Sequence, residues 1–386
     1  MAIQNICVFS GKRGGFGAYV PLMNLIEADP ELNLQILLGD MHASKEFGST
    51  VEEARKLYPK TTLEIIEMGA GRGDTPRQRA ENLGTCLEKT PGILERLKPD
   101  VMMVHGDRGE HLVVALAALN LGLPITHSQG GDVSGNIDDI QRHAIMKLAH
   151  IHFPETEDSA ERIKKLGEEP SRIHVVGSLY IDRIVKKMYT PFADIQKKYG
   201  LKEGEHYFII LLHPDTFETR DENQRIMENT LTAVRETGKR AFIIYPCSDP
   251  GYEGILKAIE GIASDPQFMI YKNIENLDFL SLMSGADALI GNSSSALVEA
   301  PYFQLPALNI GNRQMDRDRE ENVVDAKGTK EDIARKLTFV LTDDVFRKKL
   351  ATCGTRLGDG HASEKILEVV KNLTVDKKLL QKRITY

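Results

Sequence analysis

The chain has 386 residues, of which 41% are hydrophobic and 27% charged, with a formal net charge of -7 at pH 7. This length exceeds what one hydrophobic core usually organises, so we expect two domains. The acidic balance leaves no basic face to neutralise a phosphate backbone, which argues against nucleic-acid binding. An anionic small molecule can still bind through a few local donors.

The four cysteines are far apart and form no CxxC spacing: Cys7, Cys86, Cys247 and Cys353. They indicate neither a zinc site nor a disulfide framework, and a reducing compartment fits best. No run of 18 uncharged apolar residues occurs, and no charged segment at the amino terminus leads into an apolar one. We therefore expect a cytoplasmic protein without a membrane segment.

Short apolar runs alternate with longer segments of helical period, which is the pattern of a parallel sheet covered by helices. The first set of expected strands covers residues 5–10, 34–39, 101–106, 124–131 and 151–154. After about Gly177 the alternation restarts, with runs at residues 207–214, 240–250, 268–274, 287–295 and 306–312. The sequence therefore predicts an α/β protein with two doubly wound domains.

The domain boundary should fall near Tyr180–Pro191, where turn residues are mixed with an amphipathic helical pattern. We expect an amino-terminal domain over residues 1–183 and a carboxy-terminal domain over residues 184–363. The Lys-rich segment 364–386 is predicted to be a helix. Its pattern fits a solvated surface helix and a helix that returns to brace the first domain equally well.

A glycine-rich stretch, SGKRGGFGA at residues 10–18, follows the first expected strand. Its glycines allow the backbone to approach a ligand closely, and Lys12 and Arg13 bring positive charge to the same place. The stretch lacks the combination of strict GxGxxG spacing with an acidic residue at the end of the next strand. A dinucleotide cofactor is therefore not expected.

Charged side chains gather at two strand ends within residues 105–150. These candidates are Asp107 and Arg108 after one strand and Gln129, Asp132 and Asp138 after the next. Carboxylates beside an arginine can take acid and base roles when their pKa values are pulled apart. For Asp138 and Asp139, a cap or first turn of the following helix is the alternative. His143 and His150 lack the i, i+4 spacing of a metal-binding HExxH helix, so no metal site is expected.

In the second half, LLHPDT ends a strand with His213, and YPCSDPG ends another with Ser248. In open α/β sheets ligands bind beyond the carboxyl ends of the strands, so both residues are candidates for contact with a ligand. His213 can donate to a phosphate or act as an acid. A satisfied turn histidine before a proline is the equal alternative.

The stretch LIGNSSSALVEA predicts a strand, a tight turn and a serine-rich helix start. Unpaired backbone N–H groups and the hydroxyls of Ser293 and Ser294 there favour an anion such as phosphate. The alternative is that a serine only caps the helix. Glu299 could reach a ribose diol or be an exposed helix carboxylate, and Arg313 follows in a loop where a guanidinium suits phosphate.

The motifs VHGDR, HSQGGDVSGNIDDIQRHAIMKLAH, LLHPDT, LIGNSSSALVEA, NIGNRQMDRDREENV and GDGHASEKI occur in one order over nearly the whole chain. Together they resemble the hydrolysing UDP-N-acetylglucosamine 2-epimerases. The resemblance implies two Rossmann-like domains facing a central cleft, as in the glycosyltransferase-B fold. The implied reaction eliminates UDP across C1–C2 to give a 2-acetamidoglucal and then adds water to yield free N-acetylmannosamine. It needs no redox cofactor, and the resemblance further implies a homodimer or homotetramer.

Matching motifs imply roles for individual residues. The implied nucleotide contacts are Arg13 and His213 at the diphosphate, Ser293 and Ser294 at the phosphates, Glu299 at the ribose and Arg313 at the cleft side of the nucleotide. The positions that carry or support proton transfer are Asp107, Arg108 and Asp138.

The chain departs from the family pattern at Gln129, where an amide replaces a glutamate and cannot act as a proton base. Asp132 is shorter than the usual acid by one methylene, and Gly15 replaces another carboxylate. These changes suggest a different sugar, a UDP- or GDP-linked 2,4-diacetamido-2,4,6-trideoxy-glucose of legionaminic acid synthesis. A glycosyltransferase and a non-catalytic nucleotide-sugar binding protein are the remaining alternatives.

Overall fold

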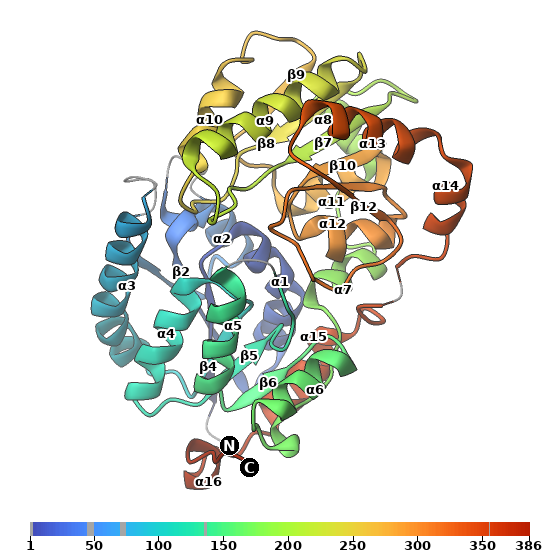
Figure 1. Cartoon of the computed structure of the whole chain (residues 1–386). Coiled ribbons are helices and arrows are strands. Elements are labelled where there is room, and N and C mark those ends of the chain that lie inside the picture. Colours follow the sequence, from blue (N-terminus) through green and yellow to red (C-terminus); the bar gives the residue numbers. More distant parts are fainter. Residues whose placement is uncertain (1–2, 45–49, 70–74, 135–136, 355) are drawn as a thin grey trace.

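The computed structural model describes residues 3–44, 50–69, 75–134, 137–354 and 356–386. Within them lie two six-stranded parallel sheets, each covered by helices (Figure 1). The first sheet has the order β3-β2-β1-β4-β5-β6 and the second the order β12-β11-β10-β7-β8-β9. Both sheets therefore repeat one topology. All strands are parallel, and the direction in which successive strands are added to the sheet reverses between β1 and β4 and between β7 and β10.

The strands of the first sheet are β1 (Gln4–Ser10), β2 (Leu32–Gly39), β3 (Thr62–Ile66), β4 (Val101–His105), β5 (Ile125–Ser128) and β6 (Ile151–Phe153). Those of the second are β7 (Tyr207–Leu211), β8 (Arg240–Ile244), β9 (Phe268–Tyr271), β10 (Ala288–Gly291), β11 (Ala307–Ile310) and β12 (Val323–Ala326). The central strands β4 and β7 are buried along their whole length. The predicted fold class, two Rossmann-like doubly wound domains facing a central cleft, is confirmed.

The helices of the first half are α1 (Arg13–Ala28), α2 (Val51–Leu57), α3 (Pro76–Leu97), α4 (Gly109–Asn120), α5 (Ile137–Leu148) and α6 (Glu157–Lys165). Between the sheets lie α7 (Leu179–Val185) and α8 (Phe192–Tyr199). The second sheet is accompanied by α9 (Arg220–Arg235), α10 (Tyr252–Glu260), α11 (Asn276–Gly285), α12 (Ser295–Val298), α13 (Lys330–Thr342) and α14 (Asp344–Leu350). Three short 3-10 helices are η1 (Asp40–Ala43), η2 (Pro170–Arg172) and η3 (Ala300–Phe303). The boundary predicted at residue 183 falls inside α7.

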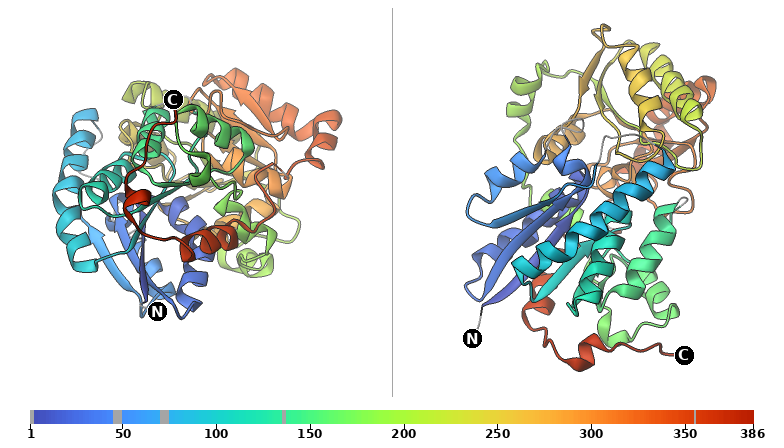
Figure 2. Two further views of the ribbon diagram at one scale, coloured as in Figure 1. Left: turned by 90° about the horizontal axis from the view of Figure 1, so that it is seen from below. Right: turned by 90° about the vertical axis from the view of Figure 1, so that its left-hand side faces the viewer.

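The last segment forms two helices, α15 (Ala362–Lys371) and α16 (Lys377–Leu380), so the single helix predicted over residues 364–386 is wrong. Both lie beside the first sheet, far from the second (Figures 1 and 2). Ile366 and Val370 of α15 pack in the same apolar cluster as Leu22 of α1. The carboxylate of Asp182 in α7 accepts the backbone N–H groups of Ala362 and Ser363 at 3.0 and 2.7 Å, which satisfies the start of α15. No helix in the described residues is long and apolar enough to cross a membrane.

Candidate active site between the two sheets

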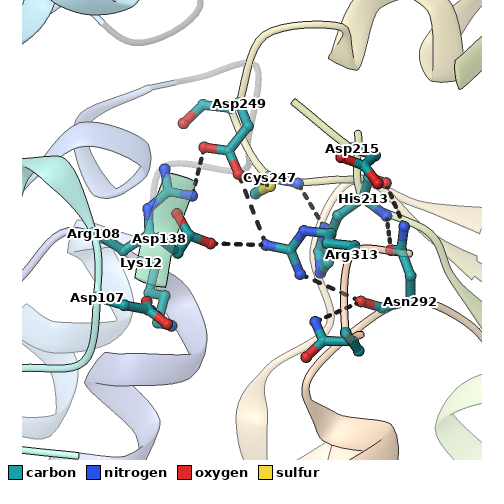
Figure 3. Close-up of polar contacts among 12 residues, drawn as sticks. Lys12, Asp107, Arg108, Asp138, His213, Asp215, Cys247, Asp249, Asn292 and Arg313 are labelled. Carbon is teal, nitrogen blue, oxygen red and sulfur yellow. Dashed lines mark hydrogen bonds and ion pairs between the residues drawn. The ribbon is translucent and has the colours of Figure 1, made fainter. Parts of the chain in front are cut away.

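A cavity lies where the carboxyl ends of the two sheets face each other (Figure 3). From the first sheet it is lined by Lys12, Asp107, Arg108, Gln129 and Asp138, and from the second by His213, Ser293, Ser294, Glu299 and Arg313. These residues follow β1, β4, β5, β7, β10 and β11. Loops at a topological switch point are where open α/β sheets bind ligands, and here two switch points share one crevice.

Asp107 follows β4 and is buried between two cations. Its carboxylate lies 3.7 Å from Lys12 Nζ and accepts a hydrogen bond of 2.5 Å from Arg142 Nη2. Burial by itself raises the pKa of Asp107, but Lys12 and Arg142 outweigh it and hold the pKa well below the usual value. Asp107 is therefore a fixed negative charge at neutral pH.

Asp138, in the first turn of α5, has the opposite environment. Burial raises the pKa of Asp138 to about 6, and the charges of Asp107 and Asp249 add to the effect, while Arg313 opposes it. Asp138 is buried and lines the cavity. Its neighbour Asp139 instead serves the turn, because it accepts the Ser134 N–H at 2.9 Å. The two adjacent carboxylates thus have different tasks.

Arg108 and Ser248 lie at the contact between the two halves. Arg108 Nη1 is 2.5 Å from Asp249 Oδ1, and Ser248 Oγ donates to Asp40 Oδ2 at 2.9 Å. Arg108 Nη2 is 3.4 Å from the same Asp40 oxygen. Ser248, predicted as a substrate contact, is therefore engaged with the first half and is not among the residues that line the cavity. Asp40 and Asp249 were missed as bridging residues.

His213 leaves β7 toward the cavity with one ring nitrogen already engaged. Nδ1 accepts the Cys247 backbone N–H at 3.0 Å, and the His213 N–H donates to Asn292 Oδ1 at 2.7 Å (Figure 3). A neutral imidazole that accepts through Nδ1 carries its proton on Nε2. His213 thus carries its donor on the Nε2 nitrogen, and its backbone also satisfies the turn.

The turn at Ser293 and Ser294 was expected to begin a regular α-helix. Instead, α12 is only four residues long and a 3-10 helix follows it. Ser294 occupies the N-cap position but makes no side-chain cap bond, whereas Ser293 Oγ accepts the Ser295 N–H at 3.3 Å. Pro301 does not continue the α-helix. Glu299 is the C-cap residue that follows α12 and is buried, and burial raises its pKa to about 7. It is not the exposed helix carboxylate of the alternative interpretation.

The arginines after β11 have three different surroundings. Arg313 donates to the Asn292 carbonyl at 3.3 Å and lines the cavity. Arg317 lines it too and lies 3.4 Å from Asp132. Arg319 pairs with Asp325 at 2.6 Å, away from the cavity.

Two candidate residues from the first half, Asp132 and Arg13, are not among the described residues that line the main cavity. Asp132 accepts from Ser159 Oγ at 2.8 Å and borders a smaller neighbouring cavity, so the structure places it outside the main one. Arg13 is the first residue of α1, and its side chain falls outside what the structure describes.

His150 is structural, since its Nδ1 accepts the Ile125 N–H at 3.1 Å. Within the described residues no group of His, Cys, Asp and Glu is arranged to hold a metal ion.

One end of the cavity was missed by the sequence analysis. Its lining includes Ile244, Asn273, Ile274, Asn276 and Phe279, from the ends of β8 and β9 and the start of α11. Apolar side chains beside amide groups suit a flat heterocycle that also needs hydrogen bonds. The signal was present, because these residues follow two strands that the apolar runs had located.

The fold and the cavity define an α/β protein whose two Rossmann-like domains face each other across a cavity lined by charged side chains. Residues 24–371 match the model of the UDP-N-acetylglucosamine 2-epimerase family, and the chain belongs to this family. It is 29% identical over 384 residues, the full length of both chains, to a UDP-N,N'-diacetylbacillosamine 2-epimerase (hydrolyzing) of Legionella pneumophila. It is 32% identical to a UDP-N-acetylglucosamine 2-epimerase of Neisseria meningitidis over 83% of each chain.

The fold is similar to a solved structure of UDP-GlcNAc 2-epimerase from Neisseria meningitidis bound to UDP-GlcNAc. The TM-score is 0.79 at 19% identity, over 96% of this chain and 100% of the other. At this identity the likeness supports the fold.

Proposed function

We propose that this protein is a hydrolysing 2-epimerase of a UDP-linked 2-acetamido sugar, which converts UDP-N-acetylglucosamine to UDP and free N-acetylmannosamine. The observation that carries the proposal is the pair Asp107 and Asp138, which line one cavity and whose pKa values are displaced in opposite directions. Elimination across C1–C2 needs a base that is ionised near neutral pH. It also benefits from a fixed negative charge where positive charge develops at C1.

In the proposed first step Asp138 takes the proton from C2. The C2–H electron pair becomes the C1=C2 double bond as the bond between C1 and the diphosphate oxygen breaks, and UDP leaves. Asp107 remains ionised because Lys12 and Arg142 compensate its charge. In the second step the oxygen of water adds to C1 and a solvent-derived proton adds to C2 from the opposite face. Gln129 takes no part as a base, since an amide does not accept a proton near neutral pH.

The diphosphate would be held from the second domain. We assign the Nε2–H of His213, the Ser294 hydroxyl and the Arg313 guanidinium to its oxygens, with Ser293 beside them and Glu299 at the ribose. The nucleotide base would occupy the end lined by Asn273 and Phe279. Arg108 then supports closure through its pair with Asp249.

A second candidate function is the same reaction on a UDP- or GDP-linked 2,4-diacetamido-2,4,6-trideoxy-glucose. The specific observation in its favour is Gln129, which lines the cavity beside Asp107 where the family pattern has a carboxylate. The Legionella relative is named for such a substrate. Product analysis on both nucleotide sugars tests the two candidates against each other.

The experiment is chromatography with mass spectrometry after incubation without an acceptor. Release of UDP together with a free 2-epimerised sugar supports the proposal. Formation of a 2-epimerised nucleotide sugar would show a non-hydrolysing epimerase, and turnover only with an added acceptor would show a glycosyltransferase. A homodimer or homotetramer and a cytoplasmic location stay predictions.

A further inference from the structure

Lys12 is the most exposed of the described cations that line the main cavity. Its side chain is 23% exposed, whereas those of the three arginines in the same lining, Arg108, Arg313 and Arg317, are at most 10% exposed. Each arginine contacts at least one carboxylate, and Arg108 contacts three. Within the described part of the chain, the carboxylate that Lys12 Nζ meets is that of Asp107, at 3.7 Å.

Asp107 has a closer partner than Lys12. The buried Arg142 donates to Asp107 Oδ2 at 2.5 Å, whereas Lys12 Nζ lies beside the other carboxylate oxygen, Oδ1. A separation of 3.7 Å is too long for a hydrogen bond. Among the described residues, the ammonium of Lys12 therefore keeps its three donors for a ligand.

The glycine-rich stretch and the end of β4 determine where this ammonium lies. A methyl group added at Gly15 would lie 3.4 Å from Lys12 Cγ and 3.7 Å from Cε, so the side chain runs along the first turn of α1. A methyl group added at Gly106 would lie 4.0 Å from Lys12 Nζ, so the ammonium stands at the end of β4. Lys12 is also the N-cap residue of α1 but makes no side-chain cap bond. The start of the helix therefore does not depend on this side chain.

We infer that Lys12 is a catalytic residue whose ammonium contacts the oxygen that joins C1 of the sugar to the diphosphate. The inference rests on the proposed function, in which the fixed charge of Asp107 lies near C1. When the C1–O bond breaks, its electron pair stays on the diphosphate oxygen and positive charge develops at C1. Asp107 then faces the positive end of the breaking bond, and Lys12 beside it faces the negative end. Lys12 keeps its proton and stabilises the leaving oxygen by its charge.

The donors assigned to the diphosphate so far all belong to the second half. Figure 3 shows Lys12 and Asp107 on one side of the site and Arg313 and His213 on the other. Arg313 also shares its charge with Asp138 and Asp249, at 3.6 and 3.8 Å. Lys12 adds a cation from the half that would hold the hexose, so the leaving oxygen would lie between cations of both halves.

The test compares the binding of UDP and UMP by calorimetry. The terminal phosphate of UDP carries the oxygen that leaves C1, UMP lacks this phosphate, and neither ligand is turned over. The variant is Lys12→Met, and the matched control is Lys56→Met, the same change at an exposed lysine of α2. We expect Lys12→Met to reduce the preference for UDP over UMP by about tenfold relative to the control, near the worth of one charge-assisted hydrogen bond. UMP should bind equally to both variants.

Turnover provides a second measurement. Lys12→Met should lower kcat by about a hundredfold relative to Lys56→Met, as the loss of a group that stabilises a developing negative charge does. An unchanged preference for UDP, equal losses of UDP and UMP binding, or a reduced preference with unchanged kcat would each overturn the inference. A wild-type protein that loses its preference for UDP through Lys12→Met but releases no free sugar refutes only the proposed function.

A double variant separates direct contact from an effect through Asp107. In an Asp107→Asn background, Lys12→Met should still reduce the preference for UDP over UMP by about tenfold. If the reduction disappears in this background, Lys12 acts through the carboxylate and the inference is wrong.

A second substitution withdraws the charge of Lys12 without removing the side chain. Gly15→Asp places a carboxylate beside Lys12 in the first turn of α1, where an acid also favours the helix start. It should lower the preference for UDP over UMP toward that of Lys12→Met, whereas Gly15→Asn should not. Equal preferences in the two Gly15 variants would contradict the inference.

Discussion

Arg313 Nη2 lies 3.6 Å from Asp138 Oδ2, although the two residues belong to different halves of the molecule. Figure 3 shows this pair together with the 3.8 Å contact between Arg313 and Asp249. The guanidinium assigned to the diphosphate therefore also acts on the carboxylate assigned to C2. The proposed function therefore predicts that nucleotide binding and proton transfer are coupled through this side chain.

Replacing Arg313 by alanine should weaken UDP binding by about 1–3 kcal/mol, the usual worth of charge-assisted hydrogen bonds. The change also removes the cation that lowers the pKa of Asp138, so that pKa should rise above its value of about 6. Titration calorimetry with UDP measures the first effect. Lost turnover with unchanged UDP affinity would contradict the assignment of Arg313 to the nucleotide.

Asp138→Asn and Asp107→Asn should each lower turnover by about two orders of magnitude or more, a typical share for groups that act in proton transfer. UDP should still bind, because neither residue is assigned to the nucleotide. Asp139→Asn is the matched control, since Asp139 bonds to the turn at Ser134. Turnover in Asp138→Asn that equals the control would remove Asp138 from the mechanism.

The pH profile of kcat/KM should show an acidic limb near pH 6. Its sign follows from the role of a base: Asp138 must be ionised, its pKa is raised to about 6, and activity is present above this pH and lost below it. Asp107 adds no limb near neutral pH, because its pKa is held well below the usual value. Initial rates at low substrate concentration in overlapping buffers measure the limb. Undiminished activity well below pH 6 would exclude Asp138 as the base.

Two serine-to-alanine changes should separate the nucleotide site from the closing contact. Ser294→Ala should weaken UDP binding by about 1–3 kcal/mol. Ser248→Ala should leave UDP affinity within about twofold and lower thermal stability instead, because its hydroxyl satisfies the buried Asp40 carboxylate. Calorimetry and thermal unfolding of both variants check the pair. Equal UDP affinities would refute the assignment of Ser294.

The fold was largely predictable because buried parallel strands appear as unbroken apolar runs. The ten runs located the eight inner strands and the edge strands β6 and β9, whereas β3 and β12 were missed. Both are edge strands with partly exposed residues, so no continuous run marks them. The sheet order was not readable, since pairing between distant strands leaves no local pattern.

The site was predictable where a strand end alone fixes a residue's position. Asp107, His213 and Ser294 line the cavity as expected. Ser248 and Asp132 also follow strands, but their side chains hydrogen-bond with Asp40 and Ser159, respectively, instead of lining the cavity. The spacing of residues along the sequence does not predict in which direction a loop leaves its strand. Partners that belong to other elements, such as Arg142 beside Asp107 and Asp249 beside Arg108, become visible only in three dimensions.

The most direct test of the central claim is incubation with UDP-N-acetylglucosamine in deuterated water without an acceptor, followed by nuclear magnetic resonance and mass spectrometry of the sugar. The proposed elimination and hydration predict free N-acetylmannosamine that carries one deuterium at C2, together with UDP. Free sugar that retains hydrogen at C2 would contradict the account, because no proton would have left C2 during the reaction.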